Sequence, residues 1–363
     1  MKILFTIIFL LVLSTGTIAQ VYSNLEKEKN DSTEYQYILP ILGEKAHASG
    51  FDLPYSAGIG ANYIWQKSDI VISNVNIGFN NGEMYDIDEL VRFNTVGSES
   101  MGINVRPDIW LFPFLNVYGI MARAHSTTNV DVGVWIPRLD TSEEIFSIQT
   151  NPEFQTTTFG FGITPTAGFL GGWLALDMNM TWTDVDALDK SVFTFIFDPR
   201  IGKTFNLKKK ESNLSFWVGG FRLKVNRDTK GNLAFNEIFN TDEIYSKIDI
   251  GYQKVGEAQT ELDNWWDGLT PIEQKNPANI AKRATNQTKL NVAGQVLASA
   301  ENAANTADNS TIQYKLDKKQ KSMWNFMVGT QYQLNKHFMV RGEYGFLTSR
   351  QHVLIGLQYR FGL

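Results

Sequence analysis

One short run in the sequence brings together residue types that could support nucleophilic catalysis. His125, Ser126 and Asn129 lie together in the stretch HSTTN. A histidine can activate a serine nucleophile while an amide orients the imidazole ring. Successive side chains of a strand point to opposite faces, however, so His125 and Ser126 would point apart. We therefore interpret the stretch as a turn and expect no enzyme.

Three carboxylates in the stretch TDVDALDK, Asp184, Asp186 and Asp189, could bind Ca²⁺. The stretch lacks the central glycine and the terminal glutamate of a dedicated calcium loop. The remaining histidines show no metal-ligand spacing with carboxylates, and the chain has no cysteine. We therefore expect a solvated acidic turn, no metal site and no cofactor.

Two adjacent tryptophans, Trp265 and Trp266, stand out in a polar part of the chain. Exposed indole rings cost apolar surface in water, so these two rings need a partner. They could pack into the rest of the fold, or they could stack on a sugar or a protein ligand. We keep both possibilities open.

The elements that position these residues have a period of two. In the last stretch of the chain one face carries apolar and aromatic side chains and the other carries polar ones. The apolar face contains Val353, Ile355, Leu357, Tyr359 and Phe361. Comparable alternation occurs near residues 57–65, 69–79, 98–111, 114–125, 129–136, 155–165, 174–183, 190–202, 213–226, 324–333 and 338–346. We count about twelve strands, many of about 10 residues, which is the length that crosses a bilayer when tilted.

Alternating strands suit either a soluble sandwich or a membrane barrel, because periodicity alone does not say which face meets water. Aromatic residues near strand ends, such as Trp110, Trp173 and Trp182, favour the interfacial girdles of a barrel. Charges and glycines on the polar faces favour a wet lumen. The terminal strand with its aromatic end resembles the targeting signal of Gram-negative outer-membrane β-barrels, although Gly362 and Leu363 follow Phe361. This resemblance is to a class rather than to one characterised family.

The N-terminus carries an export signal by its pattern. Residues 1–19 combine one lysine, an apolar run of about 11 residues and a small-residue end, which predicts a signal peptide rather than a membrane helix of about 20 residues. The ending IAQ is similar to exported proteins of Bacteroidota. The formal net charge of −5 argues against nucleic acid as a partner.

The resemblance implies an all-β fold, a transmembrane antiparallel up-and-down barrel over 57–363. Residues 20–56 would form a periplasmic or plug segment, and 227–322 a long, partly helical insertion, extracellular or lumenal. Thr270, Pro271 and Glu273 predict a capped helix start within it. Counting loops from the C-terminus puts the long stretch after residue 79 on the periplasmic side, where turns are short. Twelve strands is our prediction, and fourteen, with extra strands near 34–42 and 246–254, is the alternative.

Charged residues on the polar faces should point inward, because Arg or Lys facing lipid costs about 2–4 kcal/mol at the midplane. The predicted lumen-lining residues are Arg106, Asp108, Arg123, Asp131, Asp177, Arg222, Lys224, Arg341, Glu343 and Arg360. They could set a slight preference for anions in a channel. Equally, they could be cross-strand ion pairs that fill a closed barrel.

We therefore expect a protein of the cell outer membrane that acts as a passive channel or transporter for small solutes. A pore-less barrel with a structural or interaction role is the alternative, and a lipid-modifying enzyme is a third possibility. The expected partners are outer-membrane lipid and lipopolysaccharide, the barrel assembly machinery through the C-terminal strand, and a small solute.

Overall fold

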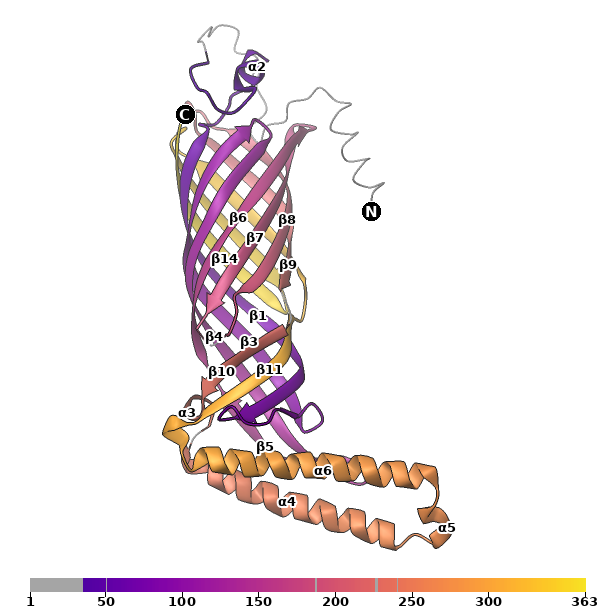
Figure 1. The fold of residues 1–363 in the computed structure, drawn as a ribbon. Helices are drawn as coiled ribbons and strands as arrows, with labels where there is room; N and C mark the ends of the chain where they lie inside the picture. Colours follow the sequence, from indigo (N-terminus) through magenta and orange to yellow (C-terminus); the bar gives the residue numbers. More distant parts are fainter. Residues whose placement is uncertain (1–34, 50, 187, 226–227, 240) are drawn as a thin grey trace.

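A closed antiparallel β-barrel forms the body of the molecule (Figure 1). The computed structural model describes residues 35–49, 51–186, 188–225, 228–239 and 241–363. Ten of the described strands form a ring, in the order β1, β14, β13, β12, β9, β8, β7, β6, β4 and β3. The ring closes where β3 pairs with β1. Four further strands, β2, β5, β10 and β11, lie outside the ring.

The ring strands are β1 (Ala57–Phe79), β3 (Val91–Phe112), β4 (Leu115–Pro137), β6 (Glu153–Phe169), β7 (Gly172–Val185), β8 (Val192–Asn206), β9 (Asn213–Val225), β12 (Trp324–Gln333), β13 (Phe338–Leu347) and β14 (Arg350–Phe361). The outer strands are β2 (Tyr85–Asp86), β5 (Ser142–Thr150), β10 (Asp228–Ala234) and β11 (Thr311–Gln320). The helices are α2 (Gly43–Ala48), α3 (Phe235–Ile238), α4 (Thr241–Asp267), α5 (Pro271–Gln274), α6 (Pro277–Ala304) and the short 3₁₀ helix η1 (Ala307–Asn309).

The predicted strand count of twelve is wrong, and the reason is strand length. Residues 57–65 and 69–79 belong to one strand of 23 residues, β1, and residues 114–125 and 129–136 to another, β4. These strands run past the ring, so each was counted twice. Of the two extra strands in the alternative, the described residues 35–42 contain none, and 246–254 is helical, within α4.

The two ends of the barrel differ, and the difference sets its orientation. Short connections join β3 to β4, β6 to β7, β8 to β9 and β12 to β13 at the end where α2 and the C-terminus lie (Figure 1). The long connections are all at the opposite end. Transmembrane barrels have short periplasmic turns and long extracellular loops, so we expect α2 at the periplasmic end and the helices α3 to α6 at the extracellular end, and we name the two ends accordingly. With β1 and β4 each a single strand, the loop after residue 79 moves to the extracellular side.

The outer surface of the ring is an apolar belt. Tyr344, Leu357 and Tyr359 are 44%, 63% and 41% exposed, whereas Arg360 is 4% exposed. The exposed belt residues on other strands include Ile59, Tyr63, Met101, Ile103, Phe161, Trp182, Phe216, Val218, Phe326 and Val340. A barrel that turns its apolar residues outward and its charges inward fits lipid around it and excludes the soluble sandwich. Among the described helices, none is long and apolar enough to span a membrane.

An extracellular extension continues the barrel beyond the ring. Past Asp69, β1 pairs with β11 in place of β14, and β11 pairs with β10. On the other side, β5 pairs with the end of β4. The antiparallel helices α4 and α6 lie across this end (Figure 1) and pack onto it through two apolar clusters. The first cluster contains Val75, Ile87, Leu90, Ile136, Ala258, Leu262, Leu290 and Ala293.

The predicted helical character of the long insertion is confirmed, including its cap. The Thr270 side chain accepts from the Glu273 backbone N–H, the Glu273 carboxylate accepts from the Thr270 N–H, and Pro271 opens α5. The strands β10 and β11 at its two ends were not predicted. Residues 35–49 and 51–56 lie at the periplasmic end, where the backbone N–H of Ile38 donates to the carbonyl of Leu363. The predicted signal peptide, residues 1–19, falls outside the described residues.

Candidate functional site

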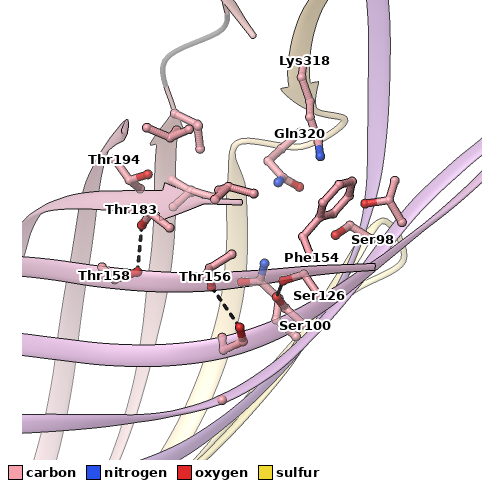
Figure 2. Close-up of a pocket in the computed structure, with 18 of the residues that line it drawn as sticks. Ser98, Ser100, Ser126, Phe154, Thr156, Thr158, Thr183, Thr194, Lys318 and Gln320 are labelled. Carbon is pink, nitrogen blue, oxygen red and sulfur yellow. Dashed lines mark hydrogen bonds between the residues drawn. The ribbon is translucent and has the colours of Figure 1, made fainter. Parts of the chain in front are cut away.

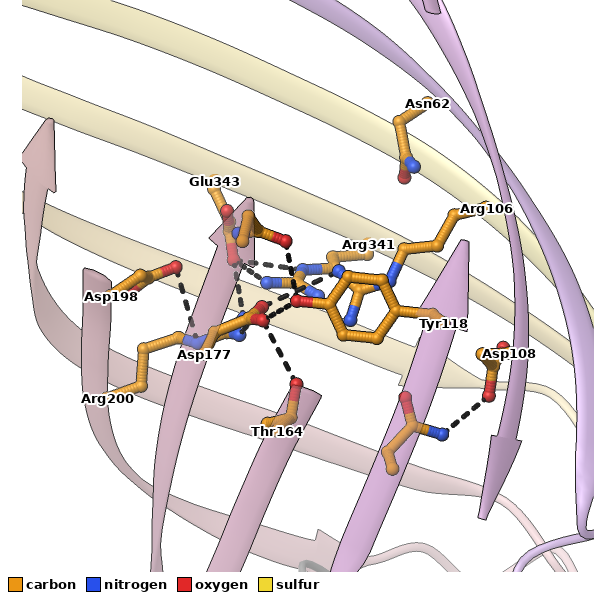
Figure 3. Close-up of polar contacts among 12 residues, drawn as sticks. Asn62, Arg106, Asp108, Tyr118, Thr164, Asp177, Asp198, Arg200, Arg341 and Glu343 are labelled. Atoms are coloured by element: carbon orange, nitrogen blue, oxygen red, sulfur yellow. Dashed lines mark hydrogen bonds and ion pairs between the residues drawn. The ribbon is translucent and has the colours of Figure 1, made fainter. Parts of the chain in front are cut away.

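A buried ion-pair cluster lies in the periplasmic half of the lumen, and Arg200 is at its centre (Figure 3). Its Nη2 lies 2.5 Å from Asp177 Oδ2, its Nη1 3.2 Å from Glu343 Oε1, and its Nε 3.6 Å from Asp198 Oδ2. None of these four side chains is more than 9% exposed. Because β8 and β13 are not neighbours in the ring, the contact from Arg200 to Glu343 crosses the interior.

Arg106 and Tyr118 extend the cluster to the other side of the barrel. Arg106 Nη1 lies 3.5 Å from Asp177 Oδ2, and its guanidinium lies 3.3 Å from the centre of the Tyr118 ring. The Tyr118 hydroxyl donates to Asp177 Oδ1. Arg341 Nε donates to Glu343 Oε1 at 2.9 Å. The lumen at this level is therefore narrowed by side chains whose charges neutralise one another.

A second group of polar contacts lies nearer the periplasm. Asp108 accepts from Arg360 at 2.9 Å, from Asn116 at 2.8 Å and from Gln358 at 2.7 Å. Arg360 Nε also donates to the backbone carbonyl of Tyr55 at 2.9 Å. This contact ties the N-terminal segment to the barrel. We call these two groups together the ion-pair floor.

A single cavity of about 970 Å³ is lined by floor residues such as Arg106, Arg200 and Glu343 and extends from there to the helices. We call it the chamber. Midway along the lumen its wall carries a ring of hydroxyl side chains, which we call the hydroxyl rung. There Thr158 contacts Thr183 at 2.8 Å and Ser100 contacts Ser126 (Figure 2). Its upper wall is apolar and includes Ile72, Val75, Phe93, Val130, Val132, Val134, Ile148, Leu223, Val225, Leu316, Val296 and Leu297. Such a volume is at the upper end of small-molecule pockets, about 300–1,000 Å³.

A smaller cavity opens beside the chamber, between β1 and β3. Backbone pairing of these strands ends at Asp69 and Gly97, although both strands continue. The cavity, of about 590 Å³, is lined by residues just past this point. It shares Ile72, Val91 and Phe93 with the chamber wall. The wall between the chamber and the exterior is therefore one side chain thick here.

The structure brings six of the ten predicted lumen residues to the interior. They are Arg106, Asp108, Asp177, Arg341, Glu343 and Arg360, all in the ion-pair floor.

The other four lie on the outer face, and this corrects the prediction. Arg123 is exposed and is paired with Ile103, which belongs to the belt. Arg222 and Lys224 are paired with Phe197 and Phe195, and the Arg222 guanidinium lies 5.9 Å from the exposed Trp324 ring. Asp131 accepts from the exposed side chains of Asn94 and Gln149. The physical reason is that the chamber wall is apolar, so the polar face of these strand ends faces outward.

Trp265 and Trp266 have partners within the helical hairpin. Lys282 Nζ lies 4.9 Å from the Trp265 ring centre, and the Arg283 guanidinium 4.5 Å from that of Trp266. Trp265 also packs against the first apolar cluster. Both rings are half-buried. The geometry thus gives each ring a packing role.

The stretches considered for catalysis and metal binding are dispersed. Ser126 points into the lumen and contacts Ser100, whereas His125 lies on the outer face, 3.4 Å from Glu153. HSTTN is not a turn, because it lies within β4. Within the described part of the chain, no group of three or more histidines and carboxylates is arranged to hold a metal ion.

Several interior residues were missed by sequence reasoning. Asp198 and Arg200 lie in β8, where apolar residues occupy both faces and hide the alternation. Trp173 was predicted to lie in an interfacial girdle, yet it is 5% exposed, and Tyr118 is 3% exposed. Lys318 and Gln320 lie in β11, which was not expected to be a strand. For Asp198 and Arg200 the available signal was their spacing of two, the spacing also seen for Arg106 with Asp108.

The closed ring, its apolar belt and its charged interior define the class: the chain is an outer-membrane β-barrel protein, located in the cell outer membrane. No protein-family model matches the sequence, and no curated protein matches it.

Solved structures similar to this chain are also outer-membrane barrels. The β domain of the Bordetella autotransporter BrkA has 7% identity and a TM-score of 0.34, covering 84% of this chain and 100% of that one. The translocator domain of the autotransporter NalP from Neisseria meningitidis has 8% identity and a TM-score of 0.33, covering 87% and 93%. The toluene transporter TbuX of Ralstonia pickettii has 8% identity and a TM-score of 0.28, covering 85% and 90%. Likeness at this level carries no argument about function.

Proposed function

We propose that this barrel is an outer-membrane transporter for small solutes, and that its solutes are predominantly apolar. The observation that carries the proposal is the chamber, a cavity of about 970 Å³ inside the barrel with an apolar upper wall. A barrel that serves only as a scaffold would gain stability by filling such a space, because cavities in a core are destabilising. The chamber is therefore maintained for an occupant.

The ion-pair floor fits a closed resting state. Solutes reach the chamber from outside, through the smaller cavity between β1 and β3 or past the helices. Passage to the periplasm then requires the Arg200, Asp177 and Glu343 contacts to rearrange. The sequence-based expectation of an anion-preferring channel is replaced by this one, because the charges neutralise each other.

The runner-up is a pore-less barrel in the cell envelope, and the ion-pair floor is the observation that favours it. Links that cross the interior, such as Arg200 to Glu343, rigidify a narrow barrel as well as they close a pathway. Uptake measurements separate the two functions, because a permanently closed barrel passes nothing.

The outer-face cations suggest how the barrel contacts the outer leaflet. Arg222 and Lys224 belong to the extracellular half of β9, and Arg123 of β4 is paired with Thr157 near the extracellular end of β6. Cations there attract the phosphates of lipopolysaccharide, at about 1 kcal/mol per charge for anionic surfaces. The alternating strand β14 would serve the barrel assembly machinery.

Uptake of an apolar dye tests the transport proposal. The protein is expressed in a Gram-negative host depleted of its own porins, and entry of N-phenyl-1-naphthylamine is followed by fluorescence. We expect faster entry than in the host alone, and several-fold slower entry for Val130→Trp, which places an indole in the chamber. Asn129→Trp, on the outer face of the same strand, is the matched control and should behave as the parent protein does. Entry no faster than in the empty host, with a folded barrel shown by heat-modifiable migration, would favour the pore-less barrel.

A further inference from the structure

At β11 a cationic side chain without an ion-pair partner lines the chamber; Arg350, which has no ion-pair partner among the described residues either, donates to Gln66. Lys318 of β11 lines the chamber (Figure 2). It lies on the same inward face of this strand as Leu316, Tyr314 and Ile312. Among the described residues, no carboxylate lies within ion-pair distance of its ammonium group, and no hydrogen bond to it is formed. Burial lowers the pKa of Lys318, as expected for an ammonium group taken out of water with nothing to neutralise it.

A second unpaired polar group lies beside it. The Oε1 atom of Gln320, two residues along the same face, is buried and has no hydrogen-bond partner among the described residues. Buried polar atoms are almost always paired, so an orphaned amide next to an orphaned ammonium indicates a missing ligand. Figure 2 shows both side chains beside the rung that carries Ser98, Ser100, Ser126 and Thr156.

The surroundings of Lys318 and Gln320 differ along the barrel axis, with polar side chains toward the periplasmic end and apolar ones toward the helices. β11 pairs with the end of β1, so that Gln320 lies opposite Ile70 and Lys318 opposite Ile72. The hydroxyl rung lies on the periplasmic side of them, near the pair Ser68 and Ser98. Above, the chamber is bounded by aliphatic side chains up to α6. A molecule that satisfies both levels has a charged or polar head and an apolar tail.

We infer that the chamber binds a single-chain amphiphile with an anionic head, whose carboxylate or phosphate is held by Lys318 and Gln320 and whose alkyl chain lies against the apolar wall. This inference rests on the proposed function and narrows it to a substrate class. The head group accepts from the Lys318 ammonium and the Gln320 amide nitrogen. A singly protonated phosphate can also donate to Gln320 Oε1, and with a carboxylate a hydroxyl of the rung is the donor. No bond is made or broken.

Binding measurements on the full chain in lipid nanodiscs test the inference. Radiolabelled dodecanoate, dodecyl phosphate and 1-dodecanol are titrated, and uptake by empty nanodiscs is subtracted. We expect saturable binding of all three, with one or both anions bound about 10- to 100-fold more tightly than the alcohol, the range of a charge-assisted hydrogen bond. The two anionic arms distinguish a carboxylate ligand from a phosphate ligand.

Variants at neighbouring positions locate the charge. Lys318→Gln should remove the preference for the anions and leave dodecanol binding unchanged, while Lys318→Arg should keep the preference. Lys319→Gln is the matched control, because Lys319 is exposed on the opposite face of β11. Folding of each variant is checked by heat-modifiable migration.

The outcomes separate this inference from the proposed function. Equal affinity of the parent protein for alcohol and anions, or equal losses in Lys318→Gln and Lys319→Gln, overturns the anionic-head inference while the chamber function stands. If none of the three probes saturates and Val130→Trp changes nothing, the chamber function fails, and the inference fails with it.

Discussion

Arg200 Nη2 lies 2.5 Å from Asp177 Oδ2, and the same guanidinium reaches Glu343 on the far side of the ring. The Arg200–Asp177 pair joins neighbouring strands, whereas the Arg200–Glu343 contact crosses the lumen, and we call this contact the strut. Both carboxylates are buried, so Arg200 is what makes their charge tolerable. The stability of the barrel and the narrowing of its periplasmic half therefore depend strongly on Arg200.

Removing this arginine should strongly destabilise the barrel. Arg200→Met leaves Asp177, Asp198 and Glu343 without their shared partner, and breaking a buried ion pair from one side costs about 3–5 kcal/mol. Urea unfolding in lipid vesicles measures the loss. Lys203→Met, on the outer face of the same strand, should change the free energy of unfolding by less than about 1 kcal/mol. Equal effects of the two substitutions would show that the cluster is not structural.

Removing both ends of the strut should open the lumen. The double variant Arg200→Ala with Glu343→Ala loses the contact that crosses the barrel, and we expect it to give steady single-channel steps in planar bilayers. The parent protein should show none or only brief openings. The outer-face double variant Lys203→Ala with Glu153→Ala serves as control. A folded but silent Arg200→Ala, Glu343→Ala barrel would mean that the lumen is too narrow to conduct.

Acid should release the helical hairpin from the extracellular extension. Arg138 Nη2 contacts Glu143 at 2.6 Å and Glu257 of α4 at 3.1 Å, and its Nη1 lies 3.5 Å from Glu261. Hydrogen bonds from Lys254, Gln253 and Arg138 lower the pKa of Glu257 to about 2. Gln253 and Lys254 belong to α4 itself, so only the share of this shift that is due to Arg138 stabilises docking. That share is present above the ordinary value near 4.5 and disappears as the pH falls toward about 2.

Spin labels measure this release directly, because the chain has no native cysteine. Labels at Ser147→Cys in β5 and Asn264→Cys in α4 should report one narrow distance distribution at pH 7 and a progressively broader one as the pH falls from about 4 to about 2. Arg138→Gln should shift the broadening to higher pH. Lys247→Gln removes an ion pair within α4 and should not shift it. A distribution that stays narrow from pH 7 to pH 2 would exclude Arg138 as the clamp.

The outer surface could be predicted from the sequence because lipid imposes one rule on every strand. Val353, Ile355, Leu357, Tyr359 and Phe361 alternate with polar residues, and the structure puts them on the belt. The interior has no such rule. At Arg222 and Leu223 the apolar side chain faces inward and the charge outward, so assigning charges to the lumen gives the opposite orientation there.

The predicted number of strands was wrong for a related reason. β1 and β4 continue past the bilayer, and their side chains change environment on the way. The polar residues 66–68 interrupt the apolar alternation of β1, so the prediction divides this strand into 57–65 and 69–79. Pairing of β11 with β1 joins residues far apart in sequence, so no local pattern predicts that Lys318 faces the chamber.

A crystal structure of the protein soaked with 12-bromododecan-1-ol tests most directly whether the chamber holds an apolar chain. The account predicts an anomalous bromine peak inside the barrel, among Val132, Ile148 and Val296 of the chamber wall. Val130→Trp should abolish the peak. Bromine found only on the outer belt, with an empty chamber in the parent protein, would contradict the account.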